Sequence, residues 1–197
     1  MAARLARSGV RPNQVSVLGV LFAAAAGAAF VALPHVEAPL QAVLLVAAAA
    51  SIQLRLLCNM LDGLLAVEGG LASPVGDLYN DVPDRIADVL ILAGAGYAIA
   101  WPWGEPLGWA AATAAVLTAY VRVLGGALGA RQYFVGPMAK PQRMAALTAA
   151  CILSLGELAV GDLQGIVLAA VLAAILAGSL VTAGRRLSLV ARELEAR

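Results

Sequence analysis

Long stretches of apolar residues, separated by short polar segments, dominate the sequence. Residues 15–33 and 163–184 contain no charged side chain, and four further stretches are mainly apolar. A helix needs about 20 mostly apolar residues to cross the hydrocarbon core of a bilayer. With 62% hydrophobic and 13% charged residues, the chain also lies far from the composition of soluble domains. We therefore predict an all-α membrane protein, a single domain over residues 1–197, with six transmembrane helices at about residues 15–33, 40–66, 75–101, 106–130, 143–160 and 163–184.

Basic residues are distributed unevenly among the predicted loops. An even number of spans places both termini on one side of the membrane, and cytoplasmic loops carry an excess of Lys and Arg. The loops at residues 34–39, 104–105 and 157–162 contain no Lys or Arg. We therefore predict that both termini and the second and fourth loops face the cytoplasm, in a bacterial-type cytoplasmic (inner) membrane. That side holds ten of the thirteen basic residues: Arg4, Arg7, Arg11, Arg131, Lys140, Arg143, Arg185, Arg186, Arg192 and Arg197.

Charge and cysteine content exclude several other classes of protein. The formal net charge is +1 and no basic stripe is present, so no nucleic-acid partner is expected. Cys58 and Cys151 both lie in apolar runs, which indicates neither a disulfide framework nor a zinc site. Residues 15–33 follow a basic segment, as in a signal peptide, but the run is longer than a typical signal core, and we expect a retained helix.

The remaining polar residues gather at the cytoplasmic ends of the second and third predicted helices. Asn59 and Asp62 are three residues apart and share one helix face. Asn80, Asp84 and Asp88 recur every four residues and form a second face. Ionisable residues inside a membrane are costly and by default indicate a functional cavity. Carboxylate and amide oxygens from two helices suit Mg²⁺ or Mn²⁺, so we predict a metal site there.

The same acids also have structural interpretations. Asp88 would pair with Arg85 or Arg122, while Asp77 and Asp81 would be solvated at the membrane surface. A small cation transporter that uses the acidic stripe is a further hypothesis, against which the lack of an inverted repeat counts.

The spacing of these residues follows a known signature. The sequence contains D-G-x-x-A at residues 62–66, followed by G-x-x-x-N-x-x-x-D at residues 76–84. This pattern resembles the signature of the CDP-alcohol phosphotransferase (CDP-alcohol phosphatidyltransferase) family, D-x-x-D-G-x-x-A-R-x8-G-x-x-x-D-x-x-x-D. Residues 11–16 are also similar to the segment that leads into the first helix of that family, so the resemblance covers nearly the whole chain.

The resemblance implies transfer of a substituted phosphate from a CDP-linked lipid alcohol to an acceptor hydroxyl, with release of CMP, in phospholipid biosynthesis. It implies one or two Mg²⁺ or Mn²⁺ ions, held by Asp62 and Asp84 with Asn59 and Asn80 at the remaining ligand positions. Asp84 would also be the general base. The implied partners are a donor such as CDP-diacylglycerol, an acceptor alcohol that no motif identifies, and membrane lipids. The implied CDP-binding residues are Asn13, Gly63, Ala66 and Gly76.

Three positions depart from the signature. Asn59 and Asn80 replace acids, and Val67 replaces the arginine. An asparagine oxygen still ligates a metal but supplies no charge, so the site would bind one ion, recruit neighbouring acids, or have lost catalysis. We favour a modified enzyme, and the alternative is a non-catalytic CDP-lipid or metal-binding membrane protein derived from the family. The neighbouring acids are Glu68, Asp77 and Asp81.

Cations of the fourth loop face the same side of the membrane. Lys140, Arg143 and, less directly, Arg131 are candidates for binding an acceptor phosphate or the lipid diphosphate. Alternatively, these cations set the orientation of the protein in the membrane and attract anionic lipid headgroups. Gly125 and Gly129 form a G-x-x-x-G pair that permits close helix packing or a homodimer. We interpret the C-terminal cations as a surface anchor: Arg185, Arg186, Arg192 and Arg197.

Overall fold

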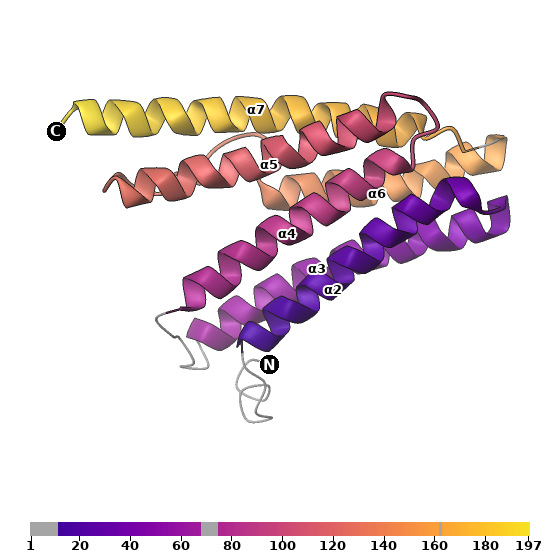
Figure 1. Cartoon of the computed structure of the whole chain (residues 1–197), viewed down its shortest axis with the longest axis horizontal. Coiled ribbons are helices and arrows are strands. Elements are labelled where there is room, and N and C mark those ends of the chain that lie inside the picture. The colour runs from indigo at the N-terminus through magenta and orange to yellow at the C-terminus, as the bar shows by residue number, and fades with distance from the viewer. Residues whose placement is uncertain (1–11, 68–74, 162) are drawn as a thin grey trace.

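The computed structural model describes residues 12–67, 75–161 and 163–197, and these residues form helices and loops without a strand (Figure 1). The all-α fold class is therefore confirmed. A short 3-10 helix, η1 (Leu33–His35), follows the first long helix. The long helices are α2 (Pro12–Ala32), α3 (Ala38–Val67), α4 (Gly76–Tyr97), α5 (Gly104–Ala127), α6 (Lys140–Val160) and α7 (Ile166–Glu195).

The six long helices pack side by side as a closed ring. Helix α2 packs on α3 and α4, α3 on α6, α6 on α7, and α7 on α5, which returns to α4. Figure 1 shows α2 beside α3 at one edge of the molecule and α5 beside α7 at the other. The apolar side chains between the helices form one large core, in which Phe30, Ile91 and Leu147 are fully buried, and a small second cluster around Cys58.

Five of these helices are long and apolar enough to cross a membrane, and the chain is therefore an integral membrane protein. The sixth, α4, is 22 residues long, but its first half is strongly charged. The five apolar segments are Pro12–His35, Ala38–Leu65, Gly104–Ala127, Lys140–Val160 and Ile166–Glu195.

Most predicted helix bounds differ from the structure by one to three residues, and two helix ends differ by more. Helix α4 ends at Tyr97 instead of residue 101, because the chain turns ahead of Pro102, which disfavours a helical residue before it. The last helix does not end at residue 184. Helix α7 continues to Glu195, since the basic C-terminal segment contains no helix-breaking residue.

Glycines allow α2 and α4 to cross at very short range. A Cβ atom added to Gly94 would lie 2.7 Å from the Cα atom of Gly27, and one added to Gly27 would lie 2.6 Å from the carbonyl oxygen of Leu90. The two backbones are thus in direct contact, as small residues permit between membrane helices. In the same way, the absence of a side chain at Gly125 makes room for Val190 of α7. The close packing at Gly125 is therefore between two helices of the same chain. A homodimer through the G-x-x-x-G pair stays a prediction.

Replacing Gly94 with valine is expected to lower the free energy of unfolding by about 1–3 kcal/mol, because the new side chain overpacks a backbone contact. Detergent-mediated unfolding measures the change. Gly156→Ala is the matched control, since an added Cβ there has no neighbour within 4 Å. Equal stability of the two variants would contradict the close crossing of α2 and α4.

Candidate functional site

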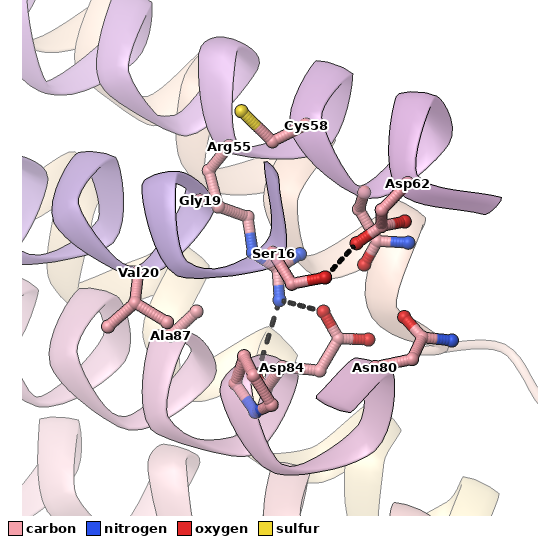
Figure 2. A pocket seen from close by; sticks show the side chains of 11 residues that line it. Ser16, Gly19, Val20, Arg55, Cys58, Asp62, Asn80, Asp84 and Ala87 are labelled. Carbon is pink, nitrogen blue, oxygen red and sulfur yellow. Dashed lines mark hydrogen bonds and ion pairs between the residues drawn. The ribbon is translucent and has the colours of Figure 1, made fainter. Parts of the chain in front are cut away.

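Three helices contribute polar side chains to one small cavity. Ser16 comes from α2, Asn59 and Asp62 from α3, and Asn80 and Asp84 from α4. The helical spacings expected from the sequence therefore bring the two predicted carboxylates and the two amides together (Figure 2). The cavity has a volume of about 10 Å³, which is space for roughly one water-sized group.

Asp62 is buried and only partly satisfied. Its Oδ2 accepts a hydrogen bond of 2.7 Å from the Ser16 hydroxyl. Its Oδ1 has no hydrogen-bond partner among the described residues. For a buried carboxylate oxygen without a partner, no hydrogen bond offsets the free-energy cost of removing it from water. Nη1 of Arg55, which lines the same cavity, also has no hydrogen-bond partner among the described residues, but of these two atoms only the carboxylate oxygen can ligate a cation.

Asp84 is bound by cations on both of its carboxylate oxygens. Its Oδ1 accepts a hydrogen bond of 3.0 Å from Nη2 of Arg55, a residue that is only 2% exposed. Its Oδ2 accepts a hydrogen bond from the Lys140 ammonium, which also donates to Oδ1 of Asn59. The Arg85 guanidinium lies 3.5 Å from the same Oδ2. Asp84 is thus compensated by side chains of α3, α4 and α6.

Asp88 lies one helical turn deeper and is fully buried. Arg143, 1% exposed, donates a 2.9 Å hydrogen bond to its Oδ2, and Arg55 lies 3.6 Å from its Oδ1. The structural interpretation of Asp88 is therefore supported. Its main partner, however, is Arg143; Arg85 lies 3.9 Å away, and the pairing with Arg122 is wrong, because Arg122 binds Asp81 at 2.7 Å.

A larger cavity of about 370 Å³ adjoins these residues. Asn59, Asn80 and Asp84 line both cavities, so they stand at the junction between the two. The larger cavity is mainly cationic, and such a surface favours phosphate oxygens over neutral groups. Its basic lining residues are Arg85, Arg122, Lys140, Arg143 and Arg186.

The loop before α6 places Lys140 in the site because α7 holds that loop. The Met138 amide donates a 3.0 Å hydrogen bond to Thr182 Oγ1, and Arg186 Nε donates one of 2.9 Å to the carbonyl of Val135. At Gly136 the backbone has φ +128°, and a Cβ atom there would lie 2.4 Å from the Thr182 side chain. The loop therefore requires glycine at this point.

The predicted CDP-binding residues are not among those that line the two cavities. Asn13 is half-buried near the start of α2, Gly63 is exposed on α3, and Gly76 begins α4. None of these three lines the two cavities. The side chain of Ala66 lies outside the described part of the structure. Around Gly63 an added Cβ would meet nothing within 4 Å, which leaves space for a ligand.

Several other predicted residues are also located away from the small cavity. Arg131 does not line the larger cavity, and its amide binds the Glu193 carboxylate. Asp81 is bound to Arg122 and therefore does not replace a missing acid beside Asp62. The side chains of Val67 and Asp77 and the whole of Glu68 lie outside the described residues.

Sequence reasoning missed three residues of the site. Ser16 and Arg55 were not assigned a role, although Arg55 precedes Asn59 and Asp62 by four and seven residues and so shares their helix face. Arg186 was interpreted as part of a surface anchor, and this is wrong. It is 5% exposed and donates hydrogen bonds to the carbonyls of Val135 and Thr118.

The donor set fits one divalent ion. Within the described residues, no three His, Cys, Asp or Glu side chains are grouped so as to hold a metal. The small cavity nevertheless offers the unpaired Oδ1 of Asp62 and the amide oxygen of Asn80, whereas Oδ1 of Asn59 already accepts a hydrogen bond from Lys140. Mg²⁺ is often bound by one or two carboxylates together with substrate phosphates and water. An ion at Asp62 that shares its remaining ligands with a bound phosphate is consistent with this arrangement.

Comparison with known proteins shows which solved structures share this fold. No protein-family model and no curated protein matches the sequence. Among solved structures, the chain is similar to phosphatidylinositol phosphate synthase from Mycobacterium tuberculosis in complex with manganese and citrate. The two share 22% sequence identity and a TM-score of 0.78, over 96% of this chain and 88% of the synthase chain. The structure of that synthase with CDP-DAG bound gives 23% identity and a TM-score of 0.74, over 96% and 93% of the two chains. The chain therefore has the same fold as this synthase.

Proposed function

We propose that the protein transfers a substituted phosphate group from a CDP-linked lipid alcohol, such as CDP-diacylglycerol, to an acceptor hydroxyl, with release of CMP, in phospholipid biosynthesis. The observation that carries this proposal is the junction of two cavities at Asp84. One cavity holds the unpaired carboxylate oxygen of Asp62, and the other is lined by cations. The likeness in fold to a synthase whose structure contains bound CDP-DAG supports the choice of donor.

The residues at the junction suit an in-line displacement at phosphorus. The acceptor oxygen forms a bond to the phosphorus that carries the lipid, while the bond from this phosphorus to the CMP oxygen breaks and CMP leaves with the electron pair. Asp84 takes the proton of the attacking hydroxyl as general base. Asp62, with the amide oxygen of Asn80, would hold a single Mg²⁺ or Mn²⁺ ion, while Asn59, predicted as a further ligand, binds Lys140 through its Oδ1. When bound, this ion neutralises charge on the diphosphate and on the departing CMP.

The cationic cavity is the proposed place for a second anionic group. Lys140 and Arg143 line it, and they are proposed to bind a phosphate of the acceptor or the lipid diphosphate. Arg131, outside its lining, is proposed only as a peripheral attraction for the same anion. Asn13, Gly63, Ala66 and Gly76 are proposed to contact the CDP moiety from the open side of the small cavity.

The proposed topology has six spans. Helix α4 is the sixth, since it packs between α2 and α5 although its first half is charged. Both termini, the loop after α3 and the loop after α5 then face the cytoplasm of a bacterial-type inner membrane, and the site opens to that side. The excess of basic residues in these segments supports this orientation.

The direct test is release of CMP. Purified protein, supplied with CDP-diacylglycerol, Mg²⁺ or Mn²⁺ and a panel of candidate acceptor alcohols, is expected to release CMP and to form a new lipid with at least one acceptor. A sample without acceptor measures background hydrolysis of the donor. If the protein neither releases CMP nor binds CDP-diacylglycerol, the proposed function is rejected.

A second candidate function rests on the two asparagines. Because Asn59 and Asn80 supply no charge, the site would retain a CDP-lipid or a metal ion without turning the donor over. Saturable binding of CDP-diacylglycerol together with no CMP release for any acceptor would favour this binding protein over the transferase.

A further inference from the structure

The ammonium group of Lys140 lies among the oxygens that the sequence pattern assigns to metal binding. It donates to Oδ1 of Asn59 on α3 and to Oδ2 of Asp84 on α4, and so bridges the two helices from the first residue of α6. The side chain is 19% exposed. Lys140 is thus held inside the site as one of its components.

The buried cluster already holds more cations than carboxylates before any metal ion is added. The carboxylates are those of Asp62, Asp84 and Asp88, and all three residues are buried. Four cations lie within ion-pair distance of Asp84 or Asp88: Arg55, Arg85, Lys140 and Arg143. A divalent ion close to Asp84 would therefore meet a carboxylate whose charge is already compensated, and it would be repelled by the ammonium.

An ammonium group has the chemical properties needed to take the place of a metal ion. Lysine carries one compact positive charge and three N–H donors. Two of these donors bind Asn59 and Asp84, and the third remains for a ligand in the larger cavity, which Lys140 also lines. A phosphate oxygen is the acceptor that this geometry suits best.

We propose that Lys140 replaces one divalent cation of the site, so that the protein works with a single metal ion at Asp62 and a built-in ammonium between Asn59 and Asp84. This inference rests on the proposed function and makes it more specific. It also explains why position 59 carries a neutral asparagine. The amide oxygen accepts a hydrogen bond from Lys140 without adding a negative charge that a second ion would have to offset. The ammonium and the single ion, when bound, would together offset the charge of the donor diphosphate.

The stoichiometry of Mn²⁺ binding tests this proposal without turnover. Mn²⁺ is titrated into the purified protein in the presence of CDP, with free Mn²⁺ followed by electron paramagnetic resonance. The wild-type chain is expected to bind one Mn²⁺. The double variant Asn59→Asp/Lys140→Met, which restores an acid and removes the ammonium, is expected to bind two. Arg192→Met, which removes an exposed cation from the C-terminal end of α7, is the control and is expected to bind one.

Two outcomes would overturn the proposal. Wild-type protein that binds two Mn²⁺ ions, or none, contradicts a site built from one ion and one ammonium, and this result does not depend on whether any variant folds. A double variant that still binds CDP and still binds only one Mn²⁺ contradicts the replacement of an ion by Lys140. Failure of the proposed transferase is distinct, since it appears as a lack of CMP release whatever the Mn²⁺ count.

Discussion

Replacement of Asp84 by asparagine is expected to slow CMP release by about 100- to 10,000-fold, the range typical of a positioned general base. Asp84 lines both cavities, so its carboxylate lies between the proposed donor and acceptor groups. Asparagine keeps the size of the side chain and an oxygen for the hydrogen bond from Arg55, but it does not take up a proton. The loss of rate is therefore assigned to the missing base only where the variant is shown to be folded.

Initial rates of CMP release from CDP-diacylglycerol measure this effect, with the unfolding temperature of each variant recorded alongside. Glu37→Gln is the matched control. It exchanges a carboxylate for an amide at an exposed position beyond the far end of α2, and it should keep the wild-type rate. A folded Asp84→Asn variant as active as this control would exclude Asp84 as the base.

Replacement of Arg143 by methionine is expected to lower the free energy of unfolding by about 3–5 kcal/mol, as when one partner of a buried ion pair is removed. Arg143 donates to Asp88 at 2.9 Å and also to the carbonyl of Met138. Without it, the fully buried Asp88 keeps only the more distant guanidinium groups of Arg55 and Arg85, at 3.6 and 3.9 Å. Unfolding in mixed detergent micelles measures the loss.

A double variant distinguishes the loss of the ion pair from the loss of packing. Arg143→Met combined with Asp88→Leu replaces both charges by apolar groups, and it should recover much of the stability lost in Arg143→Met, because buried pairs are often replaced at little cost. Strictly additive losses in the two single variants and the double variant would show that the charges are not coupled. A loss of less than about 1 kcal/mol in Arg143→Met would match an exposed ion pair and would contradict its burial.

Spacing within single helices was sufficient to predict half of the site. Asn59 and Asp62 on α3, and Asn80 and Asp84 on α4, face one cavity because residues three or four apart share a helix face. The helices themselves were equally clear, since each apolar run is about as long as a bilayer is thick. Predictions of helix ends were less accurate at two places. Helix α4 ends at a turn before Pro102, and α7 continues through the polar segment around Arg186.

The pairing of individual side chains between helices was beyond sequence reasoning. Lys140 and Arg143 lie 56 and 55 positions from Asp84 and Asp88, and only the order of helices around the ring brings them together. Ser16 carries no charge and therefore gave no signal of its bond to Asp62. Arg186 was misinterpreted because basic residues at a C-terminus also suit lipid headgroups; its burial depends on the loop that folds over α7.

Helix α4 is synthesised before several of the residues that neutralise its acids. Three of its four acids pair with a cation of α5 or α6, although Asp84 also binds Arg55 of the earlier α3. A carboxylate within a bilayer is costly until its charge is compensated. The nascent α4 is therefore not expected to insert stably into the membrane on its own. Its stable insertion requires the helices of the second half of the chain. A polypeptide that stops after α4 should be poorly retained, whereas the two halves made together should stabilise each other. The pairs that form only then are Asp81–Arg122, Asp84–Lys140 and Asp88–Arg143.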